Sequence, residues 1–196
     1  MDFLIRKDYK VCIMIDLIWK IRNVIRIKFA NRNYISKIKY LRKQGASIGE
    51  GTRLICQIGS FGTEPYLISV GKNCLFSDGI HLITHDGGVK VLSDLGYFHG
   101  ERMDIIAPIE IGDNVYIATG AYIMPGVSIG DNCIIGANAV VTRDIPANSV
   151  AVGMPAKVIK SVDEYYQNAI ERGRLFPTAQ MSPREKKEFF LNSRNN

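Results

Sequence analysis

The sequence is poor in residues that form covalent or metal cross-links, since its 196 residues include only 4 cysteines and 3 histidines. The cysteines lie far apart and form no CxxC pair, which argues against a disulfide framework and against a zinc knot. They are Cys12, Cys56, Cys74 and Cys133. We therefore expect reduced thiols in a cytoplasmic protein.

Long uncharged apolar runs are also absent. The most apolar stretch near the N-terminus, VCIMIDLIWKIRNVIRI, is interrupted by Asp16, Lys20 and Arg22. It falls short of the roughly 18 uncharged residues that a membrane-spanning helix needs. The opening MDFLIRKDYK carries charges where a secretory signal has its apolar core. We expect neither a signal peptide nor a spanning helix.

Acidic residues are scarce near the N-terminus, where residues 1–45 hold 12 Lys and Arg against 3 Asp, a net charge of +9. Ile13, Leu17, Ile21 and Val24 fall at helical spacing, which predicts a basic amphipathic helical segment. Its apolar face either packs on the protein or a neighbouring subunit, or lies on an anionic membrane surface. No aromatic platform or binding motif accompanies the charge, so we do not expect nucleic acid as a partner.

What the chain does contain is a six-residue repeat that opens on a branched apolar residue, has a mostly small second position, and has an apolar or small fifth position. The opening residues are Ile105, Ile111, Ile117, Ile123, Ile129, Ile135 and Val141. Helices repeat their buried face every three to four residues and strands every two, so neither element alone explains the period. Three such strips closing one coil would stack equivalent residues about 4.8 Å apart. The repeat therefore predicts a β-solenoid, because a β-sandwich would have loops of irregular length.

The repeat is less regular before residue 105. Ile48 and Leu54 keep it, the stretch GSFGTEPY interrupts it, and Val70, Phe76 and Leu82 resume it. Residues 86–104 contain four glycines and no residue of the repeat, which predicts a long loop ejected from the solenoid.

The repeat, together with the closing run IGANAVVTRDIPANSVAVGMPAKVIK, resembles the hexapeptide-repeat acyltransferases, and the run is similar to galactoside, maltose and polysaccharide O-acetyltransferases. The resemblance implies a mainly β fold, a left-handed parallel β-helix, over residues 46–160. Residues 1–45 then form a helical segment in front of it and residues 161–196 a helical tail behind it. Capping-box patterns at Ser161 and Ser182 predict two tail helices, which we expect to cover the open end of the solenoid.

In the resembled enzymes a histidine at the junction of coil and loop is the general base, and ITHDGG places His85 there. An imidazole with an ordinary pKa near 6.5 suits proton transfer around neutrality. The group that orients it is open between Asp86, Asp78 and a backbone carbonyl. His99 of the loop either reaches a neighbouring subunit's site or is solvated.

The resemblance also implies acetyl-CoA as co-substrate. We expect no metal, because no histidine follows residue 104, and a homotrimer with sites between subunits, because three flat faces invite cyclic packing. Thr119 and Ala137 match positions whose main-chain N–H groups meet the thioester and pantetheine, where one can stabilise an oxyanion. The remaining matching positions, along the groove and near the nucleotide's phosphates, are Thr142, Arg143, Lys157 and Lys160.

We expect O-acetylation of a sugar hydroxyl in surface-polysaccharide or lipopolysaccharide assembly. Alternatives are N-acetylation of a sugar nucleotide, acetylation of serine, a zinc carbonic anhydrase of the same fold, and a scaffold without catalysis. Tyr116 stands in NVYIATG where the galactoside and maltose enzymes have tryptophan, and the opening residues do not reproduce their acceptor-binding region. The acceptor is therefore open.

Overall fold

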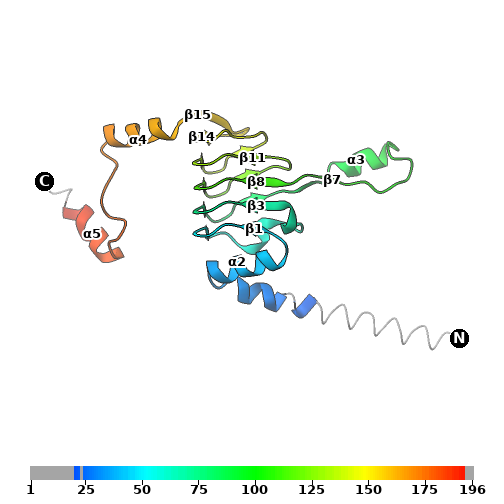
Figure 1. Ribbon diagram of the computed structural model, residues 1–196, viewed down its shortest axis with the longest axis horizontal. Coiled ribbons are helices and arrows are strands. Elements are labelled where there is room, and N and C mark those ends of the chain that lie inside the picture. Colours follow the sequence, from blue (N-terminus) through cyan, green and yellow to red (C-terminus); the bar gives the residue numbers. More distant parts are fainter. Residues whose placement is uncertain (1–19, 23, 193–196) are drawn as a thin grey trace. The chain divides into compact units, whose positions relative to one another are not determined.

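The computed structural model describes residues 20–22 and 24–192 (Figure 1). The chain forms two compact units, one ending at Val162 and one starting at Asp163, and each is described by itself. Cys12 and the predicted helical positions Ile13 and Leu17 lie outside the described residues. Because the tail belongs to the second unit, its predicted position over the end of the solenoid stays a prediction.

The first unit is a stack of coils with three faces built from short parallel strands (Figure 1). Face A consists of β1 (Ser47–Ile48), β3 (Ile68–Val70), β8 (Ile109–Ile111) and β11 (Ser128–Ile129). Face B consists of β2 (Arg53–Leu54), β4 (Leu75–Phe76), β9 (Tyr116–Ile117), β12 (Ile134–Ile135) and β14 (Ser149–Val152). Face C consists of β5 (His81–Leu82), β10 (Tyr122–Ile123) and β13 (Val140–Val141).

The chain passes through faces A, B and C in turn, so each full coil uses three hexads. Tyr122 accordingly pairs with Val140, 18 residues further along, and Glu110 pairs with Ser128 at the same separation. In the first coil the 3-10 helix η1 (Ile58–Phe61) follows face B, and it packs against β5. The predicted stacking of one hexad on another is thus confirmed.

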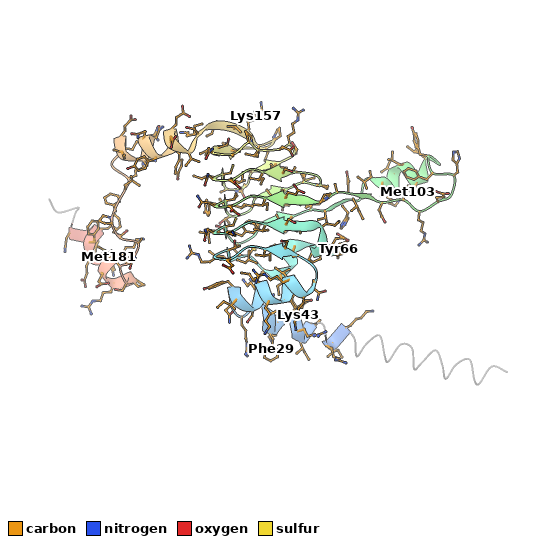
Figure 2. All side chains as sticks on the ribbon, in the orientation of Figure 1. Phe29, Lys43, Tyr66, Met103, Lys157 and Met181 are labelled. Atoms are coloured by element: carbon orange, nitrogen blue, oxygen red, sulfur yellow. The ribbon has the colours of Figure 1, made fainter. Side chains whose placement is uncertain are left out.

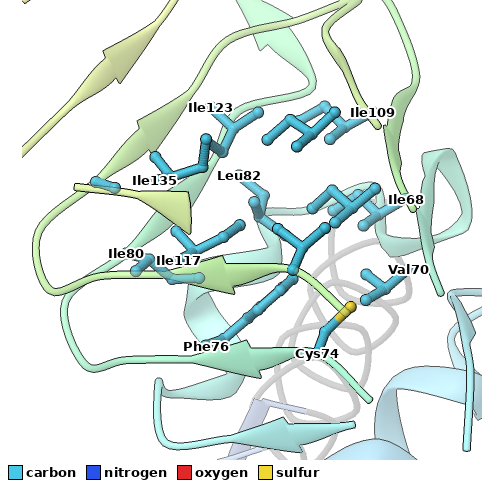
Figure 3. Packing of buried hydrophobic residues seen from close by; sticks show 14 of the residues in the cluster. Ile68, Val70, Cys74, Phe76, Ile80, Leu82, Ile109, Ile117, Ile123 and Ile135 are labelled. Carbon is cyan, nitrogen blue, oxygen red and sulfur yellow. The ribbon is translucent and has the colours of Figure 1, made fainter. Parts of the chain in front are cut away.

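The residues that open the hexads point inward and form one continuous core (Figure 3). Ile117, Ile123 and Ile135 are fully buried, as are the fifth-position residues Ala121 and Ala139. The core fills the interior with branched side chains in contact across the three faces. Its apolar area is what stabilises such short strands.

The prediction that Ile105 points into the core is wrong. Ile105 is 43% exposed, because β7 (Ile105–Ile106) pairs antiparallel with β6 (His85–Asp86) outside the coils. The column resumes at Ile109 and Ile111, both buried.

Small residues and asparagines turn the corners. At Gly130 an added Cβ would lie 2.5 Å from the backbone nitrogen of Ala147, so the neighbouring coils leave no room for a side chain. Asn114, Asn132 and Asn148 adopt positive φ angles of 57°, 55° and 59°. Their side-chain amides also hydrogen-bond from coil to coil, at 2.9 and 3.0 Å, which offsets part of the cost of that conformation.

Helix α2 (Tyr34–Lys43) closes one end of the stack (Figure 1). Its Leu41 is fully buried, and the ammonium group of the buried Lys37 donates to three backbone carbonyls of the first coil at 2.7 to 3.3 Å. These carbonyls belong to Leu54, Ile55 and Cys56. Residues 20–22 and 24–30 are also helical, in line with the predicted N-terminal helices.

The segment predicted as a loop, residues 86–104, is structured, and we call it the arm. After β6 the chain forms the short helix α3 (Val89–Asp94), and it returns to the coils through β7. Figure 1 shows this arm extending sideways from the stack. A helix of six residues is too short to show a helical pattern in the sequence, which explains why a loop was predicted here.

At the other end of the first unit, β14 pairs antiparallel with β15 (Lys157–Ser161). The second unit contains α4 (Val162–Glu171), which starts at the boundary, and α5 (Pro183–Asn192). Ser182 and Glu185 form the predicted capping box at α5, with contacts of 2.7 and 3.4 Å. Within residues 20–22 and 24–192, no helix is both long and apolar enough to cross a membrane.

Candidate active site

His85 lies at the junction where the chain leaves face C for the arm. Its strand β6 pairs His85 with Ile106, and the amide of Ala107 donates to the carbonyl of Thr84 at 2.9 Å. Two hydrogen-bonded connections therefore fix the backbone on both sides of the junction. The imidazole itself stays accessible, with 52% of its side chain exposed.

A carboxylate holds one ring nitrogen of His85. The Oε2 atom of Glu64 lies 3.0 Å from Nδ1 of His85. The same oxygen accepts a hydrogen bond of 2.7 Å from the hydroxyl of Thr84, and the other carboxylate oxygen accepts one of 2.6 Å from Thr63. The Glu64 side chain is only 16% exposed, so these three contacts lie in partly desolvated surroundings.

These contacts set the ionisation of Glu64 and, through it, the tautomer of a neutral His85. The hydrogen bonds from Thr63 and Thr84, with a smaller contribution from His85, lower the pKa of Glu64 to about 2. At neutral pH Glu64 is therefore ionised and can only accept, so the neutral imidazole carries its proton on Nδ1. The lone pair of Nε2 then faces outward, ready to take a proton.

The interruption of the repeat supplies Glu64. This residue precedes the 3-10 helix η2 (Pro65–Leu67) and follows η1, whose Phe61 is fully buried and stacks on Phe76 with ring centroids 6.3 Å apart. Gly62 turns the chain with φ of 62°, a conformation that glycine adopts without strain. The extra residues in GSFGTEPY thus bring a carboxylate beside a histidine 21 positions later in the sequence.

Neither aspartate that we considered as an orienting group contacts His85. Asp86 accepts from the amide of Gly88 at 2.8 Å and stabilises the turn into the arm. Asp78 is exposed on the opposite edge of face C, where its backbone carbonyl accepts from Gly120 at 3.2 Å. Sequence spacing favoured these neighbours because it carries no information on contacts between coils.

The other two histidines occupy different surroundings. His81 lies on the outer side of face C and stacks on Tyr122, with ring centroids 4.6 Å apart. His99 lies in the arm, exposed, with a positive φ of 50°. Among the described residues, no three His, Cys, Asp or Glu side chains are grouped closely enough to hold a metal ion.

Thr119 and Ala137 lie on one corner of the stack, in successive coils between faces B and C. The amide of Asn138 donates to the carbonyl of Thr119 at 2.9 Å, which places the two turns directly next to each other. Within the described part of the chain, the amides of Thr119 and Ala137 themselves take no part in the backbone hydrogen bonds between coils. Both residues are exposed, so these two N–H groups are available to a ligand.

The remaining predicted contacts lie further along the stack. Thr142 and Arg143 are exposed at the corner that follows face C. Lys157 is exposed and Lys160 half-buried in β15, at the end of the stack away from α2 (Figure 2). Two cations on one strand suit an anionic group such as a phosphate.

A single chain does not bring all these residues together. Thr119 and Ala137 precede face C, whereas His85 follows it, so they lie at opposite edges of the same sheet. About five residues of extended chain, or roughly 16 Å, separate these edges. A site that combines His85 with the two free amides at one thioester therefore needs a second copy of the chain.

Comparison with known proteins gives three matches of different extent. Residues 108–143 match the family model described as bacterial transferase hexapeptide (six repeats). The chain is 37% identical over 171 residues to protein CapG of Staphylococcus aureus, which covers 85% of this chain and 92% of that protein. It is 36% identical over 120 residues to galactoside O-acetyltransferase of Escherichia coli K12, covering 61% of this chain and only 57% of that enzyme.

The fold has a counterpart among solved structures. A maltose O-acetyltransferase from Clostridium difficile matches with a TM-score of 0.52 and 29% identity. The match covers 69% of this chain and 82% of that one.

Proposed function

This chain belongs to the hexapeptide-repeat acetyltransferases, and from that premise we propose that it transfers acetyl from acetyl-CoA to a sugar hydroxyl, with His85 as general base. The observation that carries the proposal is the 3.0 Å contact between His85 and the ionised Glu64 at the junction of coil and arm. The names of the galactoside and maltose relatives support a sugar acceptor. The left-handed sense of the coils is part of the same proposal and follows from the family.

The proposed reaction is a direct attack. The acceptor hydroxyl gives its proton to Nε2 of His85 while its oxygen bonds to the thioester carbonyl carbon. The carbonyl oxygen becomes an oxyanion, which a main-chain N–H at Thr119 or Ala137 stabilises. As the carbon–sulfur bond breaks, the leaving thiolate takes the proton back from the imidazolium. Glu64 stabilises that imidazolium and holds the ring in position.

The donor has a plausible path along the stack. The free amides at Thr119 and Ala137 can bind the pantetheine, and the cations on β15 can bind the phosphates. Arg143 lies between these places in the sequence and adds a further charge. These roles rest on the free N–H groups and on the positive charges. Replacing any one of these residues should therefore raise KM for acetyl-CoA more than it lowers kcat.

We further propose a homotrimer in which each site is shared by two chains. The separation of His85 from Thr119 and Ala137 within one chain supports this, since a cyclic arrangement can place the His85 corner of one copy beside the amide corner of the next. The arm supports it too, because Leu95 and Tyr97 are each 67% exposed and would be covered by a neighbour.

The proposed acceptor belongs to a surface polysaccharide or lipopolysaccharide precursor, made in the cytoplasm. The similarity of the closing run IGANAVVTRDIPANSVAVGMPAKVIK to polysaccharide O-acetyltransferases supports that class. An N-acetylated product would instead point to an amino sugar nucleotide. Mild alkali distinguishes the two, because it removes O-acetyl esters and leaves N-acetyl amides in place.

The test measures CoA release from acetyl-CoA across a panel of sugars, sugar nucleotides and lipid-linked oligosaccharides. With the accepted substrate, His85→Ala should lower turnover by roughly 10² to 10⁴, as expected for loss of a general base. The affinity for acetyl-CoA should stay close to that of the wild type. His81→Ala is the matched control, because it removes an exposed histidine that stacks only on Tyr122.

A near-normal rate for His85→Ala would contradict the assignment. A larger loss from His99→Ala would transfer the role of base to the arm. No binding of acetyl-CoA at all would leave only the scaffold interpretation.

A further inference from the structure

The end of the stack closed by α2 carries a charged surface that the proposed chemistry does not use. From Leu17 to Gly49 the sequence contains no acidic residue, whereas residues 20–43 contain nine Lys and Arg. Lys37 is buried against the carbonyls of the first coil, and the other eight are exposed. We call residues 20–43 the cationic cap.

Apolar side chains lie among these charges. Val24 is 65% and Phe29 56% exposed, and Ile21 and Ile25 are exposed to about half. Their spacing of three, four and eight residues places them on one side of a helix. Ala30 is buried and lies nine residues after Ile21, hence roughly opposite to it on a helix of 3.6 residues per turn. The apolar stripe is therefore exposed on the side of this helix away from Ala30.

Two clefts flank α2 on the same cap. One, of about 340 Å³, is lined by Ile25 and Phe29 of the first helix and by Lys39 and Lys43 of α2. The other, of about 740 Å³, shares both lysines. Figure 2 shows Phe29 and Lys43 at this end of the stack. Among the residues lining these two clefts the only acidic one is Glu50.

We propose that the cationic cap binds the surface of an anionic phospholipid bilayer. Exposed cations beside an apolar stripe are the combination that holds a helix in the interface, where cations contact phosphates and apolar side chains enter between head groups. The clefts with Lys39 and Lys43 at their border offer places for individual head groups. In the described part of the cap, no helix is both long and apolar enough to cross a bilayer.

The charge argues against a second copy as the occupant. Two caps with eight exposed cations each and no acidic residue between 17 and 49 repel one another. Nucleic acid would match the charge, but it leaves the apolar stripe without a role. The inference does not depend on the proposed acetyl transfer, since its test measures membrane binding alone.

The full-length protein is sedimented with vesicles of phosphatidylcholine alone and with vesicles that also contain phosphatidylglycerol, at low and at high salt. We expect binding to the anionic vesicles only, and weaker binding at high salt because salt screens the attraction. The combined Arg22→Gln, Arg26→Gln and Lys28→Gln changes should lower the partition coefficient about 10²-fold, since each cation near such a surface contributes about fivefold.

Matched controls separate the cap from charge and apolarity in general. Lys186→Gln with Lys187→Gln removes two exposed cations from α5 and should leave binding unchanged. Val24→Ser with Phe29→Ser should weaken binding at least tenfold, whereas Leu175→Ser, at a comparably exposed apolar residue of the second unit, should not.

Three results would overturn the inference. The first is no sedimentation with anionic vesicles at low salt, for protein whose circular dichroism shows it folded. The second is an equal effect of the control and cap variants. The third is evidence that the surface is instead a subunit or nucleic-acid interface. A change of molecular mass in light scattering for Val24→Ser with Phe29→Ser would indicate a subunit interface, and binding of single-stranded RNA that depends on the same cations and exceeds vesicle binding would indicate a nucleic-acid interface.

Discussion

At the scale of single residues, the proposed mechanism depends on the carboxylate of Glu64, which lies 3.0 Å from Nδ1 of His85 and leaves Nε2 to act as the base. We predict that Glu64→Gln lowers kcat about 10²-fold with little change in KM for acetyl-CoA, because an amide can donate to Nδ1 and stabilise the wrong tautomer. Glu64→Asp should recover part of the loss. Nitrogen NMR of the imidazole should show the Nδ1–H tautomer in the wild type and the Nε2–H tautomer in Glu64→Gln.

Asp86→Asn is the matched control, since it also converts a carboxylate next to His85 to an amide but should keep the acceptor for Gly88. It should retain nearly full activity. Because the pKa of Glu64 is lowered to about 2, its charge is lost only as pH falls from about 4 towards 2. A Glu64→Gln enzyme with wild-type kcat would show that the contact is structural.

Single residues also mark where the sequence was informative. His85 was singled out because a histidine at the junction of coil and loop is the general base in the resembled enzymes, and its role here stays a proposal. Glu64 could not be predicted, because its contact crosses 21 positions and depends on how an interruption of the repeat folds. The interruption itself was the available signal, since extra residues between two regular coils must leave the core and reach the surface.

At the scale of the element, each regular hexad contributes its first and its fifth side chain to the common core. We predict that Ile123→Ala, at a fully buried position of face C, lowers the free energy of unfolding by about 2 to 5 kcal/mol per chain. Ile159→Ala, at a residue 54% exposed, should change it by about 0.5 kcal/mol or less. Denaturant unfolding at one fixed protein concentration measures both, and equal effects would contradict the core assignment.

The arm is the element on which subunit association should depend. We predict that Leu95→Ser with Tyr97→Ser shifts the assembly towards smaller species in light scattering and lowers activity with it. Lys90→Ser, in the helix α3 that precedes these two residues in the arm, should leave the mass unchanged. If the double variant keeps the mass of the wild type, the arm does not hold the subunits together.

The elements differ in how well the sequence predicts them. The coils could be predicted from the six-residue period, because a hexad and the third hexad after it lie on the same face of the stack. Ile105 keeps the period by coincidence, and only pairing with β6 reveals that it belongs to the arm. Helix α3 could not be predicted, because it buries none of its side chains and therefore has no apolar stripe in the sequence.

At the scale of the whole molecule, the account requires that one chain supplies His85 and another supplies the amides of Thr119 and Ala137. Two variants, each inactive alone, test this requirement. His85→Asn removes the base, and Ala137→Trp blocks the corner where the thioester would lie. In a mixed trimer, some sites would combine the intact His85 of an Ala137→Trp chain with the intact amide corner of a His85→Asn chain.

The decisive measurement is acetyl transfer by a mixture of these two variants, assembled together by co-expression. Random assembly predicts about a quarter of wild-type activity per site, because each site draws its two halves independently from the two kinds of chain. Each variant alone should show about 1% or less. Activity in the mixture no higher than in the separate variants would contradict a shared site built around His85.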